Sequence, residues 1–400
     1  MTLARRLWVA PAALALTGCV VTPVDYGKIP HADYVADPRC TAQPGAPVDG
    51  AALPLFFVTS RLPDCRTDDI RLMSHRGDQV RYGRFAEPHE TPAGGKKTVL
   101  RTPMAFQEQG DWWQALQAET DRRQGRVLLY VHGYRETFET TSKDAAQIAR
   151  MTGFDGPVIE YSWPSQGEVL KYAVDETNMY HDVRTFGAFL RALADKAWVK
   201  EIVIVSHSLG ARLVIPAIAS ADRMSRRADR TGNISNIILA SPDVDRETFE
   251  RDIVDEVLAS DRVALGRHIT VYVSRADKAL AVSRALHGYP RLGSPYCFDP
   301  FEAQALKDKG LPERCYPAAR SGMTVIDTTD VSRGSTGHSN FLRSAVACRD
   351  FIDVIGGQLT RPQRVATQVA HVFRLVPDPA EPKERDAEIC SRTGSDDDAG

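Results

Sequence analysis

Short runs of apolar residues, rich in β-branched and aromatic side chains, recur along the chain from about residue 55 onward. They cover residues 55–59, 127–131, 158–161, 202–205, 237–240, 269–273 and 323–326. Most of the later runs lack strict alternation, which is typical of parallel strands buried on both faces. Stretches with helical periodicity lie between them, such as 140–152 and 183–197. This order predicts one doubly wound α/β domain, with helices on both faces of a mostly parallel sheet.

The segments outside this alternation divide the chain. Residues 19–52 are rich in Pro, Ala, Asp and Gly and predict a tether, which leads into a folded domain at 53–360. Residues 82–126 are less regular and leave room for a hairpin or two. The long Pro- and Gly-rich stretch 284–322 favours a surface excursion near a site. A C-terminal extension, 361–400, ends in a polar, Pro-rich tail that predicts disorder.

The composition is that of a globular protein, with 43% hydrophobic and 26% charged residues. The formal net charge is −2, without the basic surplus that nucleic-acid binding requires, so no nucleic-acid partner is predicted. Beyond the N-terminus, no apolar stretch reaches the roughly 18 residues of a membrane span. An enzyme and a binding domain remain as the open classes.

The N-terminus reads MTLARRLWVAPAALALTGC and has the parts of an export signal. A basic pair precedes an apolar stretch that is too short to cross a bilayer. The closing Leu-Thr-Gly-Cys resembles the lipobox of bacterial lipoproteins, which implies removal of residues 1–18 and acylation of Cys19. Several acyl chains would anchor the protein to a membrane, facing the periplasm, and Val20 in place of Asp favours the outer membrane. The alternative is a plain secretory signal with an incidental Cys.

Export also bears on the remaining cysteines. With Cys19 as the anchor, six cysteines are left, and an even number in an oxidising compartment indicates disulfides. Six cysteines can pair in 15 ways. Closeness in the sequence favours the scheme with the bonds Cys40–Cys65, Cys297–Cys315 and Cys348–Cys390. The alternative is one or more free buried thiols. None has zinc-ligand spacing, so no metal site is predicted.

The most informative motif is EIVIVSHSLG at 201–210, followed by a helix-like stretch. It matches a nucleophile elbow, a sharp strand-to-helix turn with the nucleophile Ser208 at its tip. The residues two before and two after the nucleophile crowd each other and must be small, and Ser206 and Gly210 meet that demand. The alternative is that Ser208 caps the helix of an ordinary crossover.

A second motif fits the same chemistry. The apolar run 127–131 leads into His132-Gly133-Tyr134. Acyl transfer needs two backbone N–H donors that face the developing oxyanion. The residue after the nucleophile supplies one, here Leu209, and the loop after an earlier strand supplies the other, here Tyr134. A plain turn is the alternative for this loop.

The expected chain order then places an acid and a histidine after the serine. Asp277 follows the run 269–273, and His338 follows the run 323–326 after a loop, so each lies past the carboxyl end of a strand. We therefore predict the triad Ser208, Asp277 and His338. The rival acids are Asp243 and Asp245, and the rival bases are His287, His268 and His371.

These motifs resemble the α/β-hydrolase superfamily and, more narrowly, a bacterial family of uncharacterised esterase- and lipase-like hydrolases. The resemblance covers roughly 55–345 and rests on FVTSRLPD (57–64), YGR (82–84), YVHGYRETF (130–138), FDGPVIEYSWPSQG (154–167), SHSLG (206–210), NIILASPDVD (236–245), LHGYPRLG (286–293) and GHSNF (337–341). It implies an α/β-hydrolase fold, with Ser208 as nucleophile, His338 as base and Asp277 as acid. One departure is Arg135, where relatives usually carry Asn.

The sequence therefore predicts a serine hydrolase that cleaves a small-molecule or lipid ester or thioester through an acyl-enzyme on Ser208, without a cofactor. An amidase or peptidase with the same triad is the first alternative, because the leaving group cannot be read from the sequence. A non-catalytic envelope lipoprotein that uses the fold for binding is the second.

Overall fold

The computed structural model describes residues 55–64, 71–85, 104–228, 233–259, 268–296, 304, 307–310, 315–357, 363–377 and 390. The predicted signal peptide, Cys19, the tether and the pair Cys40–Cys65 lie outside these residues. No helix within the described ranges is long and apolar enough to cross a membrane.

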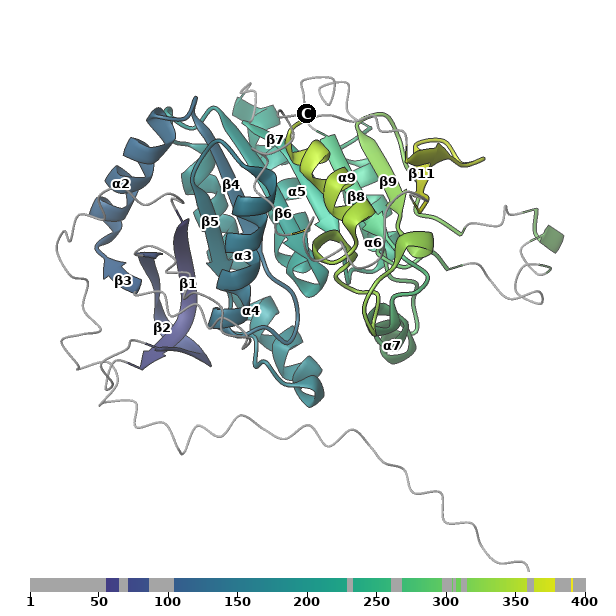
Figure 1. Cartoon of the computed structure of the whole chain (residues 1–400), viewed down its shortest axis with the longest axis horizontal. Coiled ribbons are helices and arrows are strands. Elements are labelled where there is room, and N and C mark those ends of the chain that lie inside the picture. The colour runs from purple at the N-terminus through teal and green to yellow at the C-terminus, as the bar shows by residue number, and fades with distance from the viewer. Residues whose placement is uncertain are drawn as a thin grey trace, which may run out of the picture.

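The described strands form an 11-stranded sheet in the order β10-β11-β9-β8-β7-β6-β4-β5-β1-β2-β3 (Figure 1). Their bounds are β1 (Leu55–Asp64), β2 (Arg71–Phe85), β3 (Met104–Gln107), β4 (Arg126–Val131), β5 (Val158–Ser162), β6 (Glu201–His207), β7 (Ile234–Ala240), β8 (His268–Val273), β9 (Met323–Asp327), β10 (Arg364–Ala366) and β11 (Val372–Leu375). The eight neighbouring strands β11-β9-β8-β7-β6-β4-β5-β1 pair in parallel. The antiparallel pairs of the described sheet lie at its two ends, between β10 and β11 and among β1, β2 and β3. Each predicted apolar run lies within a strand, and the predicted fold class is confirmed.

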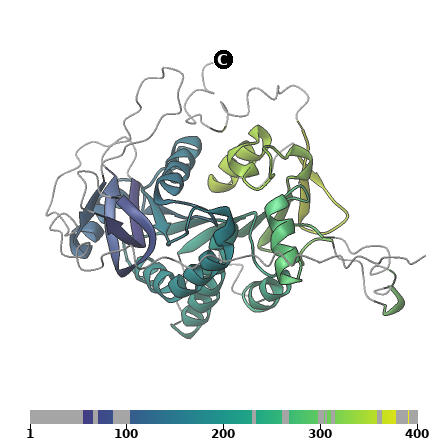
Figure 2. The ribbon, with the colours of Figure 1, turned by 90° about the horizontal axis from the view of Figure 1, so that it is seen from below.

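Helices cover both faces of this sheet (Figure 2). They are α2 (Gln109–Asp121), α3 (Phe138–Thr152), α4 (Tyr172–Ala194), α5 (Ala211–Ala228), α6 (Arg246–Phe249), α7 (Lys278–His287) and α9 (Ala345–Ile355), with short turns η3 (Val169–Lys171), η4 (Ser208–Gly210), η5 (Glu250–Asp255), η7 (Thr329–Val331) and η8 (Asn340–Leu342). Side chains from α2, α4, α5 and α6 pack in one core layer, and side chains from α3 and α9 pack in the other.

The central strands are apolar throughout because they supply both layers. In β4, Val127, Leu129 and Val131 pack toward α4 and α5, while Leu128 and Tyr130 pack toward α3 and α9. All five side chains are fully buried. Because both faces of these strands are buried, no position faces water and polar residues do not alternate with apolar ones. This explains the unbroken apolar runs in the sequence.

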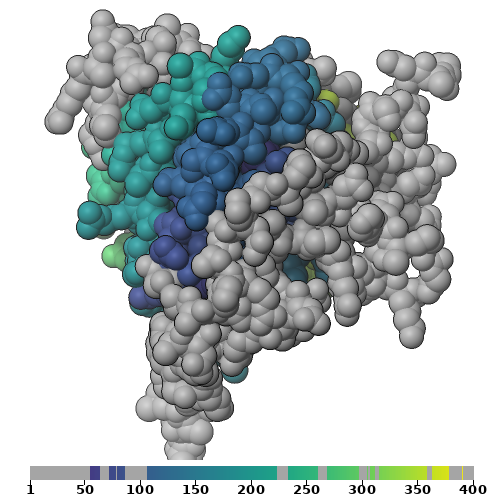
Figure 3. Space-filling view, turned by 90° about the vertical axis from the view of Figure 1, so that its left-hand side faces the viewer, coloured from purple at the N-terminus to yellow at the C-terminus, as the bar shows by residue number. Residues whose placement is uncertain are grey.

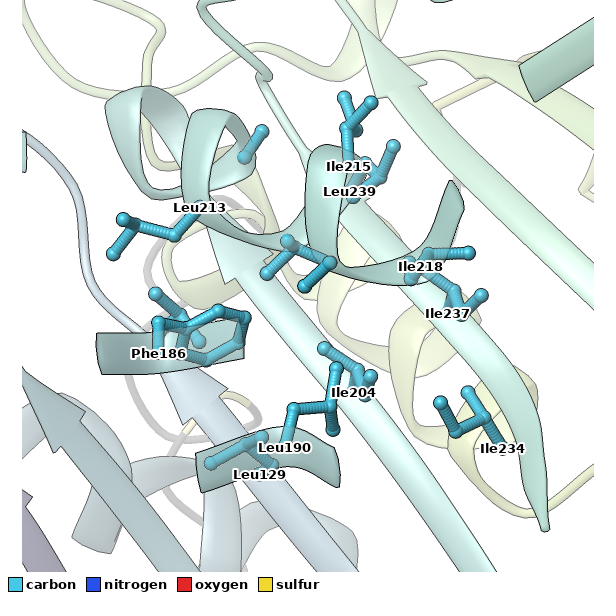
Figure 4. Close-up of a cluster of buried hydrophobic side chains, with 14 of the residues drawn as sticks. Leu129, Phe186, Leu190, Ile204, Leu213, Ile215, Ile218, Ile234, Ile237 and Leu239 are labelled. Carbon is cyan, nitrogen blue, oxygen red and sulfur yellow. The ribbon is translucent and has the colours of Figure 1, made fainter. Parts of the chain in front are cut away.

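The α4–α5 side of the core is closely interlocked (Figure 4). Phe186 and Leu190 of α4 lie beside Leu129 and Ile204 of the central strands. Each such buried side chain contributes about 1.5–3 kcal/mol relative to exposure. This layer gives β6 and the start of α5 a rigid support, and the predicted nucleophile lies between them.

The N-terminal end of the sheet holds elements that the sequence did not define. Figure 3 looks onto this end, where purple residues of the first strands lie beside the blue residues that follow 104. The hairpin expected in 82–126 is formed by β2 with β3, and β2 also begins earlier and pairs with β1. Helix α2 was not predicted. Its Trp112 donates from Nε1 to the Gly83 carbonyl at 2.9 Å and packs on Phe56, so α2 covers the end of the sheet.

The C-terminal edge is held by a disulfide and two short strands. Cys348 of α9 bonds to Cys390, as predicted. Cys315 is also disulfide-bonded, and because the other described cysteines pair together, its partner lies outside the described residues. Strand β11 pairs in parallel with β9, so the sheet continues past 360 into the predicted C-terminal extension.

The start of the predicted surface excursion is part of the fold. Helix α7 runs to His287, and Arg291 and Leu292 are almost fully buried, at 3% and 0% exposure. Leu292 N donates to the Val244 carbonyl at 2.8 Å, and Gly293 N donates to the Pro242 carbonyl at 2.9 Å. The surface prediction is wrong for these residues, because their backbone pairs with the loop after β7.

The strand order creates one switch point. From β4 the chain passes through α3 to β5 on one side, and then through α4 to β6 on the other side of β4. The loops after β4 and β6 therefore leave in opposite directions, and open parallel sheets bind ligands at such a point.

Candidate active site

Ser208 forms the turn between the central strand and its helix. Strand β6 ends at His207, Ser208 begins η4, and α5 follows at Ala211. The φ of Ser208 is +51°, a left-handed conformation that costs a non-glycine residue about 1–2 kcal/mol. Backbone strain of this kind concentrates at functional sites. The N-terminal end of α5 lies next to this residue and favours negative charge there.

Two glycines allow the turn to form against β4. A Cβ on Gly210 would lie 2.3 Å from the His132 carbonyl oxygen, which no side chain tolerates. A Cβ on Gly133 would lie 2.8 Å from the Cβ of Ser208. Ser206 is fully buried, and its hydroxyl has no hydrogen-bond partner among the described residues. Both glycines are therefore required by the close approach of the elbow to the end of β4 and the loop after it.

Asp277 and His338 are hydrogen-bonded to each other. His338 Nδ1 donates to Asp277 Oδ2 at 2.7 Å, across 61 residues of chain. The Asp277 side chain is fully buried and that of His338 is 14% exposed. The other carboxylate oxygen, Oδ1, accepts from Leu280 N at 3.0 Å and caps α7. The carboxylate is held from both sides, and the imidazole keeps Nε2 free of this interaction to accept a proton.

The rival acids are engaged elsewhere. Asp243 Oδ1 accepts from Arg291 Nε and from Ser283 Oγ, each at 2.7 Å, and Oδ2 accepts from the Tyr172 hydroxyl at 2.5 Å. Asp245 Oδ1 accepts from Thr248 N at 2.7 Å and caps α6. These contacts give Asp243 the role of an ion-pair centre and Asp245 that of a helix cap.

Two of the rival histidines, His287 and His268, have other partners, and His371 is exposed. His287 lies at the end of α7, with Nε2 3.0 Å from Glu176 Oε1 and Nδ1 2.7 Å from the Ser283 carbonyl. His268 Nε2 lies 3.0 Å from Thr324 Oγ1. None of these contacts involves Asp277, whose carboxylate is hydrogen-bonded to His338.

The loop after β4 presents the predicted oxyanion donor. The Tyr134 N–H meets no acceptor among the described residues, so it is available to a ligand. The following residue, Arg135, has a φ of +63°, a conformation that Asn adopts more readily than Arg.

Two buried charged residues hold this loop, and neither was among the predicted site residues. Arg61 of β1 donates from Nη2 to the Glu136 carbonyl at 2.9 Å and from Nη1 to the Ser165 carbonyl at 3.0 Å. Asp175 of α4 accepts from Arg135 N at 3.1 Å and from Ser165 Oγ at 2.5 Å. Burial raises the pKa of Asp175 to about 6, against the effect of these hydrogen bonds. The clamp fixes the backbone directly after Tyr134.

Trp163 packs beneath the same loop. Its ring stacks on His132 at 4.9 Å, its Nε1 donates to the His132 carbonyl at 2.9 Å, and it is fully buried. Trp163 is therefore a core residue that supports the loop.

The electrostatics separate the two histidines near the elbow. Burial opposes the charged form of His338, but the Asp277 charge and hydrogen bond outweigh it and raise its pKa above the usual value. Burial and the nearby His338 lower the pKa of His207 to about 3. His207 therefore stays neutral near neutral pH, whereas Asp277 favours the protonated form of His338.

An elbow serine, a strand-end carboxylate and a histidine from the loop after the next strand, all at the carboxyl edge of a parallel sheet, define an α/β hydrolase. Residues 108–356 match the family described as "Alpha/beta hydrolase of unknown function" (DUF900), and the chain belongs to this family. The match confirms the predicted superfamily and the prediction that the protein is a hydrolase.

Several solved structures are distantly similar. A predicted CIB-like hydrolase from Thermoplasma acidophilum has 13% identity and a TM-score of 0.33, over 70% of this chain and 91% of that one. An esterase from Pyrobaculum calidifontis has 12% identity and a TM-score of 0.31, over 60% of this chain and 78% of that one. The ester hydrolase EH1AB1 from the metagenome of Lake Arreo has 13% identity and a TM-score of 0.30, over 70% of this chain and 78% of that one. No curated protein matches the chain. At these values the structural similarities carry no argument about the substrate.

Proposed function

We propose that this α/β hydrolase cleaves carboxylic esters or thioesters through an acyl-enzyme on Ser208. The observation that supports it best is the 2.7 Å hydrogen bond from His338 Nδ1 to the buried Asp277, beside a serine on a strained strand-to-helix turn. Tyr134 N–H and Leu209 N–H are the donors to the oxyanion in this proposal. The reaction needs no cofactor.

The proposed reaction has two halves. His338 Nε2 takes the proton of Ser208 Oγ while Oγ bonds to the ester carbonyl carbon. The bond from that carbon to the leaving oxygen or sulfur then breaks, and the leaving group departs with the proton that His338 held. Water next loses a proton to the same nitrogen and attacks the acyl carbon, and Ser208 leaves with that proton.

Covalent labelling tests this proposal. A fluorophosphonate probe reacts with an activated serine, so the wild-type protein should be labelled and Ser208→Ala should not. Ser206→Ala is the matched control, because it removes a buried hydroxyl without a described partner from the same turn. It should be labelled at the wild-type rate. Folded wild-type protein that takes up no label would instead favour the binding protein without catalysis.

Pairs of substrates that differ only in the leaving group show whether the enzyme prefers esters or amides. Esters and amides with the same acyl group should be hydrolysed at different rates, with the ester faster. Amide hydrolysis at a comparable kcat/KM would favour the amidase or peptidase alternative.

We also propose that Cys19 carries a lipid anchor that holds the enzyme at the bacterial envelope, facing the periplasm. The lipobox-like sequence supports this location, and the residue after Cys19 favours the outer membrane.

A further inference from the structure

The outward face of α7 is apolar, although a surface helix normally presents polar residues to water. Leu280 and Ser283 face inward and are buried. Lys278 and Gly288 are exposed, and the exposed apolar residues of the helix and of the turn after it are Ala281, Val282, Ala285, Leu286 and Tyr289. The three large side chains among them keep 60%, 58% and 59% of their surface exposed.

A second exposed apolar pair lies beside this helix. In η3, Val169 is 59% exposed and Leu170 is 78% exposed. Tyr172, at the start of α4, joins the two elements, because its hydroxyl lies 3.2 Å from Ser283 Oγ of α7. We call the exposed set Val169, Leu170, Val282, Leu286 and Tyr289 the apolar rim.

The apolar rim borders the proposed site on two sides. The Tyr134 hydroxyl donates to the Glu168 carbonyl at 3.2 Å and also to the Val169 carbonyl, so the loop that carries one oxyanion donor contacts η3. Asp277 is the N-cap of α7. Both α4 and α7 reach the lower side of the molecule in Figure 1.

Exposed cations lie next to the same residues. Arg135 follows Tyr134, and Arg275 and Lys278 flank Asp277. The carboxylates on this border are Glu168, Glu136 beside Arg135, and Asp330 beside the Thr329 that Arg275 contacts. Apolar side chains bordered by Arg and Lys match a lipid surface with anionic headgroups, where the chains enter the interface and the cations meet the phosphates.

We infer that the apolar rim docks on an anionic lipid surface and that the enzyme takes its ester substrate from that surface. This inference rests on the proposed esterase function, since docking would bring an acyl ester from the bilayer to Ser208. It narrows the substrate class to esters with long apolar chains.

Site-directed fluorescence tests the docking without any catalysis. In the full chain, Leu286→Trp should shift to shorter wavelength and lose intensity when vesicles of phosphatidylglycerol and phosphatidylcholine carry brominated chains. Val365→Trp is the matched control, because Val365 is 45% exposed on the edge strand β10 and is not part of the apolar rim. Equal responses of the two variants, or none from either, would overturn the docking whether or not Cys19 carries a lipid.

Hydrolysis separates this inference from the proposed function. Leu170→Ser combined with Leu286→Ser should lower the rate on a long-chain ester embedded in those vesicles by about tenfold or more. The rate on a soluble butyrate ester should stay within about twofold, and Val365→Ser should change neither rate. Loss of both rates together would contradict docking, whereas a wild-type protein inactive on both esters would contradict the esterase proposal itself.

Self-association would explain the same apolar rim differently. Sedimentation velocity should show no change in mass between the wild type and the double serine variant. A wild-type dimer that dissociates in this variant would overturn the lipid assignment in favour of a second copy of the chain.

Discussion

The ring of His207 donates from Nε2 to the backbone carbonyl of His338 at 3.2 Å, and the two rings lie 4.8 Å apart. The residue before the proposed nucleophile therefore holds the residue proposed as its base. His207 is also 5.3 Å from the Phe341 ring, in the turn that follows His338. Because its pKa is lowered to about 3, His207 adds no positive charge beside His338 at neutral pH. The elbow thus supports the base as well as the nucleophile.

His207→Phe should retain the ring packing but lose the hydrogen bond to the His338 carbonyl. We expect kcat to fall by about tenfold with KM nearly unchanged, because small displacements of a catalytic group reduce the rate steeply. Steady-state kinetics and thermal unfolding of the same samples check this. His207→Gln, which keeps a side-chain N–H donor, is the control and should recover part of the rate. Equal kcat for wild type and His207→Phe would show that this contact does not position the base.

The pH profile should reflect the raised pKa of His338. A protonated imidazolium cannot accept the Ser208 proton, so kcat/KM falls as pH decreases through this pKa. Because Asp277 raises the pKa above the free-histidine value of about 6.5, the midpoint should lie above that value. Rates from pH 5 to 9 give the midpoint. In Asp277→Asn the residual activity should have a midpoint at lower pH, and an unchanged midpoint would argue against the assigned pair.

The sheet could be predicted because burial on both faces makes its strands unbroken apolar runs. The elbow could be predicted because its residues lie close together in the sequence. The contact that requires Gly210 is not local, since a Cβ there would lie 2.3 Å from the His132 carbonyl oxygen. Helix α2 was missed, although Trp112, Leu116 and Thr120 recur every fourth residue. That stripe is narrow, since α2 covers the end of the sheet rather than a broad face.

The supports of the site could not be predicted, because they join distant parts of the chain. Arg61 lies 75 residues from Glu136, whose carbonyl it binds. Asp175 lies within α4, where an acid is ordinarily a solvated residue, yet it holds the loop after β4. Arg61 lies in the segment FVTSRLPD, but that segment carried only a family resemblance and assigned Arg61 no role, and Asp175 belongs to no motif. Only the register of β1 beside β5 brings Arg61 to the loop.

Replacement of Cys19 tests the anchor. If acyl chains on this sulfur hold the protein at the membrane, Cys19→Ala should move it from the membrane fraction to the soluble fraction or leave the precursor unprocessed. Cell fractionation with mass spectrometry of the N-terminus measures both. Correctly cleaved Cys19→Ala protein that still sediments with membranes would exclude the lipid as the anchor.

The bond from Cys348 to Cys390 should stabilise the fold. It closes a segment of 42 residues, for which chain entropy gives about 4 kcal/mol. Cys390→Ala should therefore lower the free energy of unfolding by about 2–4 kcal/mol, measured by denaturant titration. Reduction of the wild type should have a similar effect. A second bond, Cys297–Cys315, stays a prediction, and peptide mapping without reductant identifies the partner of Cys315.

The assignment of the acid is the sharpest test of the site. Asp277→Asn should lower kcat by up to about 10⁴ while the protein stays folded, because Asn caps α7 as well as Asp but cannot stabilise the imidazolium of His338. Asp243→Asn should act differently. It leaves Arg291 and Arg212 with a neutral partner, so the free energy of unfolding should fall by about 3–5 kcal/mol.

Kinetics and denaturation of the two variants separate these effects, because each substitution changes one carboxylate to an amide of the same shape. The loss at position 277 should appear in kcat with little change in the unfolding midpoint. The loss at position 243 should appear in the midpoint, and the folded fraction should keep most of its kcat. If Asp243→Asn instead abolishes kcat in folded protein while Asp277→Asn stays active, the acid belongs to the loop after β7. Asp277 would then serve only as the N-cap of α7, through its bond from Leu280 N.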